Sequence, residues 1–132
     1  MKLDRRSLLG LMGAGAASPA LAQGAATGRA AFLHGVASGD PDTRSAVFWT
    51  RITPGEASSG EVAVVLEVAR DADFRDIVRR AAGLKASAER DFTVKHDLDG
   101  QGLAPGQDYF YRFVAGEVVS PVGRVRTLPE RA

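Results

Sequence analysis

The sequence predicts an all-β protein, an antiparallel β-sandwich of about seven short strands that follows an N-terminal signal peptide. Three observations carry this prediction. Alternating apolar and polar runs recur about every ten residues, separated by clusters of Gly, Pro and Asp. The single tryptophan, Trp49, lies on an early run, and Tyr109 follows a Pro-Gly turn as a tyrosine corner requires. Together these features are typical of an immunoglobulin-like domain close to the fibronectin type III arrangement.

The first two strands are expected over residues 31–37 and 45–52. A dense turn signal of Ser, Gly, Asp and Pro ends the first run, and Pro-Gly closes the second. In the second run, alternate side chains point to opposite faces of a sheet, so Trp49 and Phe48 face opposite ways. We expect Trp49 to fill the space between the two sheets, as large aromatics on strands usually do, and Phe48 to point outward.

The middle of the chain supplies three further runs. Residues 62–68 alternate regularly and predict a third strand, after which Phe74 is expected to turn inward and plug the core. Residues 77–84 are ambiguous, because their paired arginines and alanines could sit on a helical turn. The neighbouring strands favour a short edge strand in which the charges guard the edge. Residues 92–98 alternate again and predict a fifth strand.

Two further strands are expected near the C-terminus, and the first of them is rich in aromatic residues. One face of the first is expected to point inward and holds Tyr109, Tyr111 and Phe113. Phe110 and Val114 then point outward, which is unusual for a small sandwich unless something covers them. Residues 118–128 form the final strand, with Pro121 at an edge or bulge because it cannot donate a ladder hydrogen bond.

The first 22 residues have the order of an export signal. Basic Arg5 and Arg6 precede an apolar region over 8–17, which is too short for a bilayer span of about twenty residues. An A-x-A site at Ala20 and Ala22 predicts cleavage after residue 22. The paired arginines indicate the twin-arginine route, so we expect the translocase as a partner, a periplasmic or secreted location and no stable membrane anchor after cleavage.

The predicted mature chain starts with a flexible lead-in over residues 23–30, which is small and polar. The whole sequence has 17 basic and 16 acidic residues; without the signal, 14 and 15 remain, a net charge of about −1. No basic patch is left to bind phosphate backbones, so we expect no nucleic-acid partner. The absence of cysteine is compatible with an oxidising compartment and shows only that the fold does not depend on disulfides.

No catalytic, cofactor-binding or metal-binding residue can be assigned from the sequence. A two-metal phosphatase site needs several histidines in motifs such as Asp-x-His, whereas only His34 and His96 exist and neither has such a partner. Gly39-Asp40 matches a fragment of that pattern, but the following proline indicates a turn. Residues 35–39 place their serine one position too late for a G-x-S-x-G nucleophile elbow.

Two blocks of sequence carry a specific resemblance. Residues 32–41 read FLHGVASGDP and residues 46–54 read AVFWTRITP. Both resemble the start of the alkaline phosphatase D (PhoD-like) family, phosphomonoesterases and phosphodiesterases exported by the twin-arginine route. The similarity continues to the Thr-Leu-Pro at residues 127–129 and covers nearly all of the predicted mature chain.

The resemblance implies a two-domain enzyme. Residues 31–128 are similar to its small N-terminal domain, and residues 129–132 look like the start of a linker to a larger metallophosphatase domain of calcineurin-like type that is absent here. In the family, that second domain holds iron and calcium and performs the hydrolysis. We therefore expect a noncatalytic N-terminal module with no cofactor of its own, and the metallophosphatase domain as its partner.

Three residues are candidates for contact with that partner: His34, because it lies in a family block, and Phe48 and Phe110, because they are expected to face outward. Two alternatives stay open. Both faces of these strands could be partly buried within the domain itself. The chain could also be a free-standing exported binding or adhesion domain, because a sandwich fold alone assigns no function.

Overall fold

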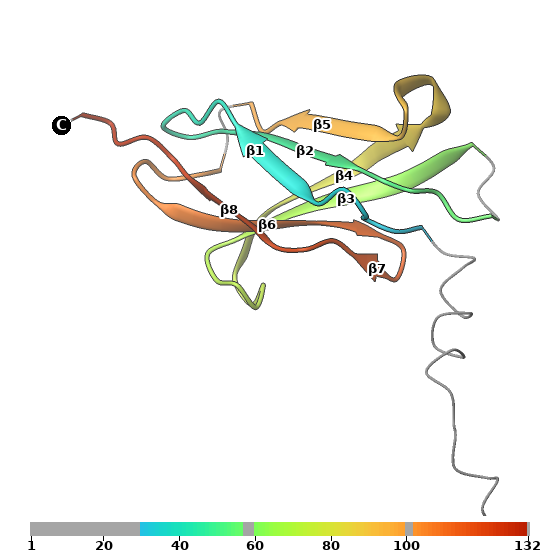
Figure 1. Ribbon diagram of the computed structural model, residues 1–132. Helices are drawn as coiled ribbons and strands as arrows, with labels where there is room; N and C mark the ends of the chain where they lie inside the picture. The colour runs from blue at the N-terminus through green and yellow to red at the C-terminus, as the bar shows by residue number, and fades with distance from the viewer. Residues whose placement is uncertain (1–29, 57–59, 100–101, 132) are drawn as a thin grey trace, which may run out of the picture.

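The computed structural model describes residues 30–56, 60–99 and 102–131, which form two antiparallel sheets packed face to face (Figure 1). The smaller sheet has the order β1-β2-β5, with β1 at Val36–Gly39, β2 at Val47–Arg51 and β5 at Thr93–Asp97. The larger sheet has the order β4-β3-β6, with β4 at Ile77–Ser87, β3 at Glu61–Ala69 and β6 at Asp108–Ala115. Two short strands, β7 (Val118–Val119) and β8 (Gly123–Arg126), both pair with β6.

The predicted antiparallel sandwich is confirmed. A short 3-10 helix, η2 (Ala88–Arg90), carries the chain from β4 in one sheet to β5 in the other. Among the residues described, no helix is long and apolar enough to cross a membrane. The predicted signal, with Arg5, Arg6, Ala20 and Ala22, lies outside the described residues, as does the lead-in up to residue 29.

The core lies between the two sheets and is built from alternate residues of each strand. Phe48 of β2 and Tyr111 of β6 meet edge to face across it, with ring centroids 4.8 Å apart and an interplanar angle of 65°. Such a pair adds about 0.5–1.5 kcal/mol to the burial of its apolar area. Burial raises the pKa of the Tyr111 hydroxyl, and a hydrogen bond with Ser38 of β1 acts in the opposite direction without cancelling it.

The alternation predicted for β6 is confirmed, because its three inward aromatics are almost completely buried: Tyr109, Tyr111 and Phe113. The prediction for β2 was wrong. Phe48 and Thr50 are fully buried, whereas Trp49 is only half-buried and lies outside the core. Trp49 pairs with Ala37 on one side and Lys95 on the other, on the outer face of the smaller sheet.

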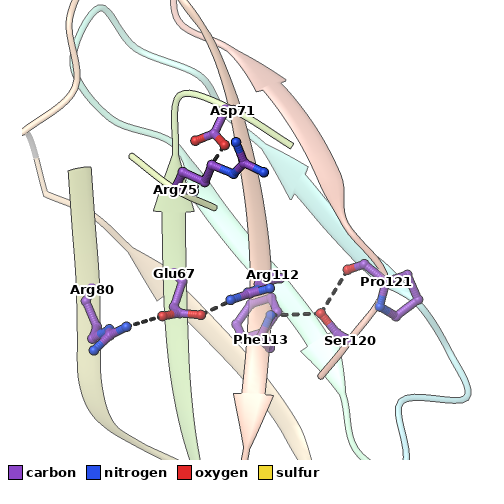
Figure 2. Close-up of polar contacts among 8 residues, drawn as sticks. All are labelled: Glu67, Asp71, Arg75, Arg80, Arg112, Phe113, Ser120 and Pro121. Atoms are coloured by element: carbon purple, nitrogen blue, oxygen red, sulfur yellow. Dashed lines mark hydrogen bonds and ion pairs between the residues drawn. The ribbon is translucent and has the colours of Figure 1, made fainter. Parts of the chain in front are cut away.

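The tyrosine corner predicted at the turn before β6 is confirmed. The Ala104 N–H donates a hydrogen bond of 2.7 Å to the hydroxyl oxygen of Tyr109, whose side chain is 1% exposed. The final strand is divided at Pro121 into β7 and β8, as a residue without an N–H requires. Ser120 bridges the break: its hydroxyl oxygen accepts from the Phe113 N–H at 2.8 Å (Figure 2).

Residues 77–84 lie in an edge strand, as predicted, but β4 is longer and continues to Ser87. Phe74, in the connection that precedes it, is buried but does not join the core between the sheets. Its ring instead packs under the guanidinium of Arg112, with 4.1 Å from the guanidinium carbon to the ring centroid. Asp71 folds this connection, because its carboxylate accepts hydrogen bonds from the backbone N–H groups of Asp76 and Arg75, and these bonds lower its pKa. Figure 2 shows the contact with Arg75.

Candidate interdomain site

The segment after β8 is held firmly against the body of the sandwich. Thr127 is 1% exposed, and its hydroxyl donates to the Ala104 carbonyl at 2.6 Å while accepting from the Gln107 N–H at 3.0 Å. The Gly106 N–H donates to the Leu128 carbonyl at 3.0 Å. Gly106 has a φ of +64°, which strains any other residue, and a Cβ there would lie 3.7 Å from Pro129.

The loop between β1 and β2 holds the same segment from its other side. The Leu128 N–H donates to the Asp42 carbonyl at 3.0 Å, and Arg44 pairs with Glu130 at 2.8 Å. The loop is folded on itself, because the Asp42 N–H donates to the Ser45 carbonyl at 2.8 Å. We call the contacts of residues 127–130 with this loop and with the turn at 104–107 the C-terminal clamp.

The C-terminal clamp presents a mixed surface at one end of the sandwich, where the segment after β8 runs past the β1–β2 loop (Figure 1). Leu128 is 49% exposed although its backbone is fixed on both sides. Asp40 and Pro41, the last residues of the first family-like block, are also exposed. A fixed backbone that offers an apolar side chain beside charged ones suits a docking surface.

His34 lies at the other end of the sandwich, where it contacts Arg51 of β2. The Nη1 of Arg51 is 2.6 Å from His34 Nε2, and since guanidinium only donates, this nitrogen accepts. Arg51 also donates to the carbonyl and carboxylate of Asp91, at 3.1 and 3.0 Å. This His34 cluster, His34 with Arg51 and Asp91, ties the chain before β1 to the loop before β5, and all its contacts are exposed.

The three predicted contact residues are not brought together. Phe48 is 0% exposed and cannot offer a contact surface, because β2 turns it toward Tyr111 in the core. Phe110 is half-buried on the outer face of β6, between Ala69 of β3 and Arg124 of β8. His34 lies beside the smaller sheet, so it and Phe110 belong to opposite sides of the molecule.

A buried carboxylate occupies the outer face of the larger sheet. Glu67 of β3 lies opposite Arg80 of β4 and Arg112 of β6, and binds both, with Arg112 Nε at 2.9 Å (Figure 2). Burial raises the pKa of Glu67, but the hydrogen bonds from Arg112 and Arg80 outweigh it, and the pKa lies below its ordinary value. The cross-strand triad satisfies its own charges, which indicates a structural role.

No group of three or more His, Cys, Asp or Glu side chains that could hold a metal ion is found within residues 30–56, 60–99 and 102–131. The two histidines do not lie together. His34 contacts Arg51, whereas the half-buried His96 of β5 pairs with Phe48 of β2.

Sequence reasoning missed the C-terminal clamp, which joins residues far apart in the chain. Its hydrogen bonds are mostly between backbone groups of Leu128, Asp42 and Gly106, and these leave no pattern of side chains. The sequence offered only Thr127 itself, since a buried threonine must find partners for its hydroxyl, and nothing in the sequence places it beside the turn at Pro105-Gly106.

Comparison with known proteins identifies the fold. The sequence matches the family described as "PhoD-like phosphatase, N-terminal domain" over residues 16–129. Alkaline phosphatase D of Bacillus subtilis (strain 168) is 43% identical over 103 residues, which are 74% of this chain and 17% of that protein. The solved structure described as "Structure of PhoD" superimposes with a TM-score of 0.66 at 42% identity, covering 74% of this chain and 19% of that one.

This chain therefore spans less than a fifth of the relatives that it matches. The likeness includes the sandwich described above, and the family match runs through the clamped Thr127 and Leu128 to Pro129. The chain belongs to the family of PhoD-like phosphatase N-terminal domains.

Proposed function

We propose that this chain is the noncatalytic N-terminal module of an exported PhoD-like alkaline phosphatase or phosphodiesterase, and that it packs against a metallophosphatase domain of calcineurin-like type. The family match and the 43% identity to a named alkaline phosphatase D support the assignment to such an enzyme. In the proposed enzyme, iron and calcium would be held by the metallophosphatase domain, where they would activate the nucleophile and bind the phosphate.

The observation that carries the packing proposal is the C-terminal clamp. Thr127 and Leu128 are fixed by hydrogen bonds from two separate loops, so a domain that follows Glu130 starts from a defined position. It starts beside Leu128 and the exposed Asp40–Arg44 loop, and these surfaces are the first it can cover. Because the connection is already fixed, docking loses less conformational entropy.

Export follows from the paired Arg5 and Arg6, which are typical of the twin-arginine route. That route carries folded proteins, which suits an enzyme that takes up its metal ions before it crosses the membrane. The enzyme is then periplasmic or secreted, and the signal is cleaved after Ala22.

A chimera tests the proposal. The matching region of Bacillus subtilis alkaline phosphatase D is replaced by residues 30–131 of this chain, and hydrolysis of p-nitrophenyl phosphate and bis-p-nitrophenyl phosphate is assayed with iron and calcium. We expect activity from the chimera and none from residues 30–131 alone. Metal-dependent turnover by the chain alone contradicts a noncatalytic module.

The packing itself is tested by Leu128→Asp in the same chimera, because a charge at this partly exposed position disfavours a covered apolar contact. We expect lower thermal stability of the catalytic activity, with little change in the isolated chain. Val122→Asp is the matched control, since Val122 is 47% exposed but lies outside the clamp. Equal effects of the two substitutions contradict docking at the clamp.

A further inference from the structure

A cleft of about 330 Å³ opens between the edge strands β4 and β5, which belong to different sheets and are joined by η2. Its walls carry charged, hydroxyl and apolar residues from β4 and β5, from η2 and from the start of β3: Lys85, Ser87, Val94, Lys95, Arg90 and Glu61. The volume lies within the range of small-molecule sites, about 300–1,000 Å³.

A β-bulge shapes one wall of this cleft. Val64 pairs with Leu84 and Leu66 with Ala81, so two residues of β4 oppose a single residue of β3. One of the two is Gly83, whose φ of +80° favours glycine, and a Cβ there would meet no atom within 4 Å. A bulge bends its strand, and Gly83 adds no side chain to the space that this leaves.

The charge of the cleft is positive. Lys85, Arg90 and Lys95 oppose one carboxylate, Glu61, whose Oε2 is 3.5 Å from Lys85 Nζ with both side chains more than 60% exposed. Such an exposed pair is weak. Within the described part of the chain, Arg90 and Lys95 have no ion pair, and the neighbouring Asp91 is bound by Arg51.

Hydrogen-bond donors and an apolar wall complete the site. Ser87 precedes η2 without making a side-chain capping bond, so its hydroxyl is free to donate. Thr93 already donates to the Arg90 carbonyl at 2.7 Å and can only accept. Val94 and Leu84 form the apolar part of the wall, which suits an organic group attached to the anion.

We propose that this cleft binds an organic phosphate ester. Arg90 and Lys95 bind the phosphate oxygens, the Ser87 hydroxyl donates a further hydrogen bond, and Leu84 and Val94 contact the organic group. The site lies entirely within this chain and does not depend on a metallophosphatase domain. It gives the module a binding activity of its own, so its test is independent of the function proposed above.

The lone tryptophan provides a local signal for this binding. Trp49 pairs with Lys95 in the β2–β5 ladder and is half-buried on the outer face, so its indole N–H resonance is close to the site. Residues 30–131 are titrated at an ionic strength of about 0.1 M with phenyl phosphate, inorganic phosphate and phenol, followed by NMR and by calorimetry. We expect saturable binding of phenyl phosphate, weaker binding of inorganic phosphate and none of phenol.

Charge reversal identifies the contacts. Arg90→Glu and Lys95→Glu are each expected to weaken the binding of phenyl phosphate about tenfold, because each removes one charge-assisted hydrogen bond. Arg75→Glu is the matched control, an exposed arginine outside the cleft, and should leave affinity within about twofold because distant surface charges are screened. Glu61→Gln removes the opposing carboxylate and should tighten binding about twofold, which damage to the fold cannot imitate.

Three outcomes overturn the proposal. The first is the absence of a saturable shift with phenyl phosphate in the unmodified chain. The second is an equal loss of affinity in Arg75→Glu, which indicates nonspecific attraction. The third is inorganic phosphate binding as tightly as phenyl phosphate, which removes the role given to Leu84 and Val94.

Discussion

The two ends of the sandwich are held by different kinds of contact. At the C-terminal clamp, backbone groups and the buried Thr127 hydroxyl join three segments. The tyrosine corner supports the same turn, because the Tyr109 hydroxyl binds Ala104. At the opposite end, the His34 cluster joins the half-buried Arg51 to the exposed His34 and Asp91, and the cleft between β4 and β5 stays open. Buried backbone hydrogen bonds cannot be exchanged for water without loss, whereas exposed ion pairs can.

The difference suggests a division of roles within one small domain. A rigid end suits the fixed attachment of a second domain, because it sets the position of whatever follows. An end with exposed contacts and an open cleft suits the exchange of a small ligand, which needs access. Local opening should accordingly be easier at the His34 cluster than at the clamp.

The largest expected effect comes from Thr127→Val, which keeps the shape of the side chain but removes its hydroxyl. The Ala104 carbonyl and the Gln107 N–H each lose a partner, so we expect a loss of about 2–4 kcal/mol in the free energy of unfolding. Urea denaturation of residues 30–131 measures it. Thr93→Val is the matched control at the opposite end, where one exposed bond of 2.7 Å is lost and the cost stays below about 1 kcal/mol. Equal costs would remove the contrast between the ends.

A smaller loss is expected for Tyr109→Phe, which tests the corner behind the clamp. The Ala104 N–H loses its 2.7 Å acceptor while the ring stays in place, which costs about 1–2 kcal/mol. Amide hydrogen exchange locates the effect: protection of residues 104–107 should fall, while β2 and β5 stay protected. Unchanged exchange at the turn would show that the corner does not support the clamp.

The local features of this fold were predictable from the sequence. The tyrosine corner depends on a short spacing before Tyr109. In β6, the inward aromatic residues alternate with polar residues such as Asp108 and Arg112, so the two faces could be told apart. The faces of β2 were not predictable in the same way, because both carry large apolar groups. Packing decided between them: Phe48 fits against Tyr111, which leaves Trp49 beside Lys95 outside.

The candidate sites were less predictable, because they depend on contacts between distant segments. The clamp joins Leu128 to Asp42 through backbone atoms, and the cleft depends on a bulge at Gly83 that only pairing with β3 creates. His34 was singled out for its place in a family-like block, yet its contact with Arg51 of the second block could not be read from either block alone.

Acid should act mainly on the middle of the molecule, between the two ends. Glu67 has a pKa below its ordinary value, so its contribution to stability is complete above that ordinary value and is lost as pH falls through the lowered one. Glu67→Gln should therefore flatten the fall in unfolding free energy on the acid side of about pH 4.5. Thermal unfolding across this pH range measures the slope. Glu130→Gln, at an exposed pair, is the control and should leave the slope nearly unchanged.

The smallest effects in the isolated chain belong to the ion pairs at the two ends, and these locate the docking surface. Arg44→Ala breaks an exposed pair with Glu130 and should cost less than about 1 kcal/mol, and Arg51→Ala, which releases His34 and Asp91, about 1 kcal/mol.

In the phosphatase chimera the order of the two losses should reverse. A domain docked at the clamp shields the Arg44 pair from water and strengthens it, while the Arg51 contacts stay exposed. Thermal midpoints of both variants in both proteins test this, and a larger chimera-specific loss for Arg51→Ala would move the docking surface to the His34 end.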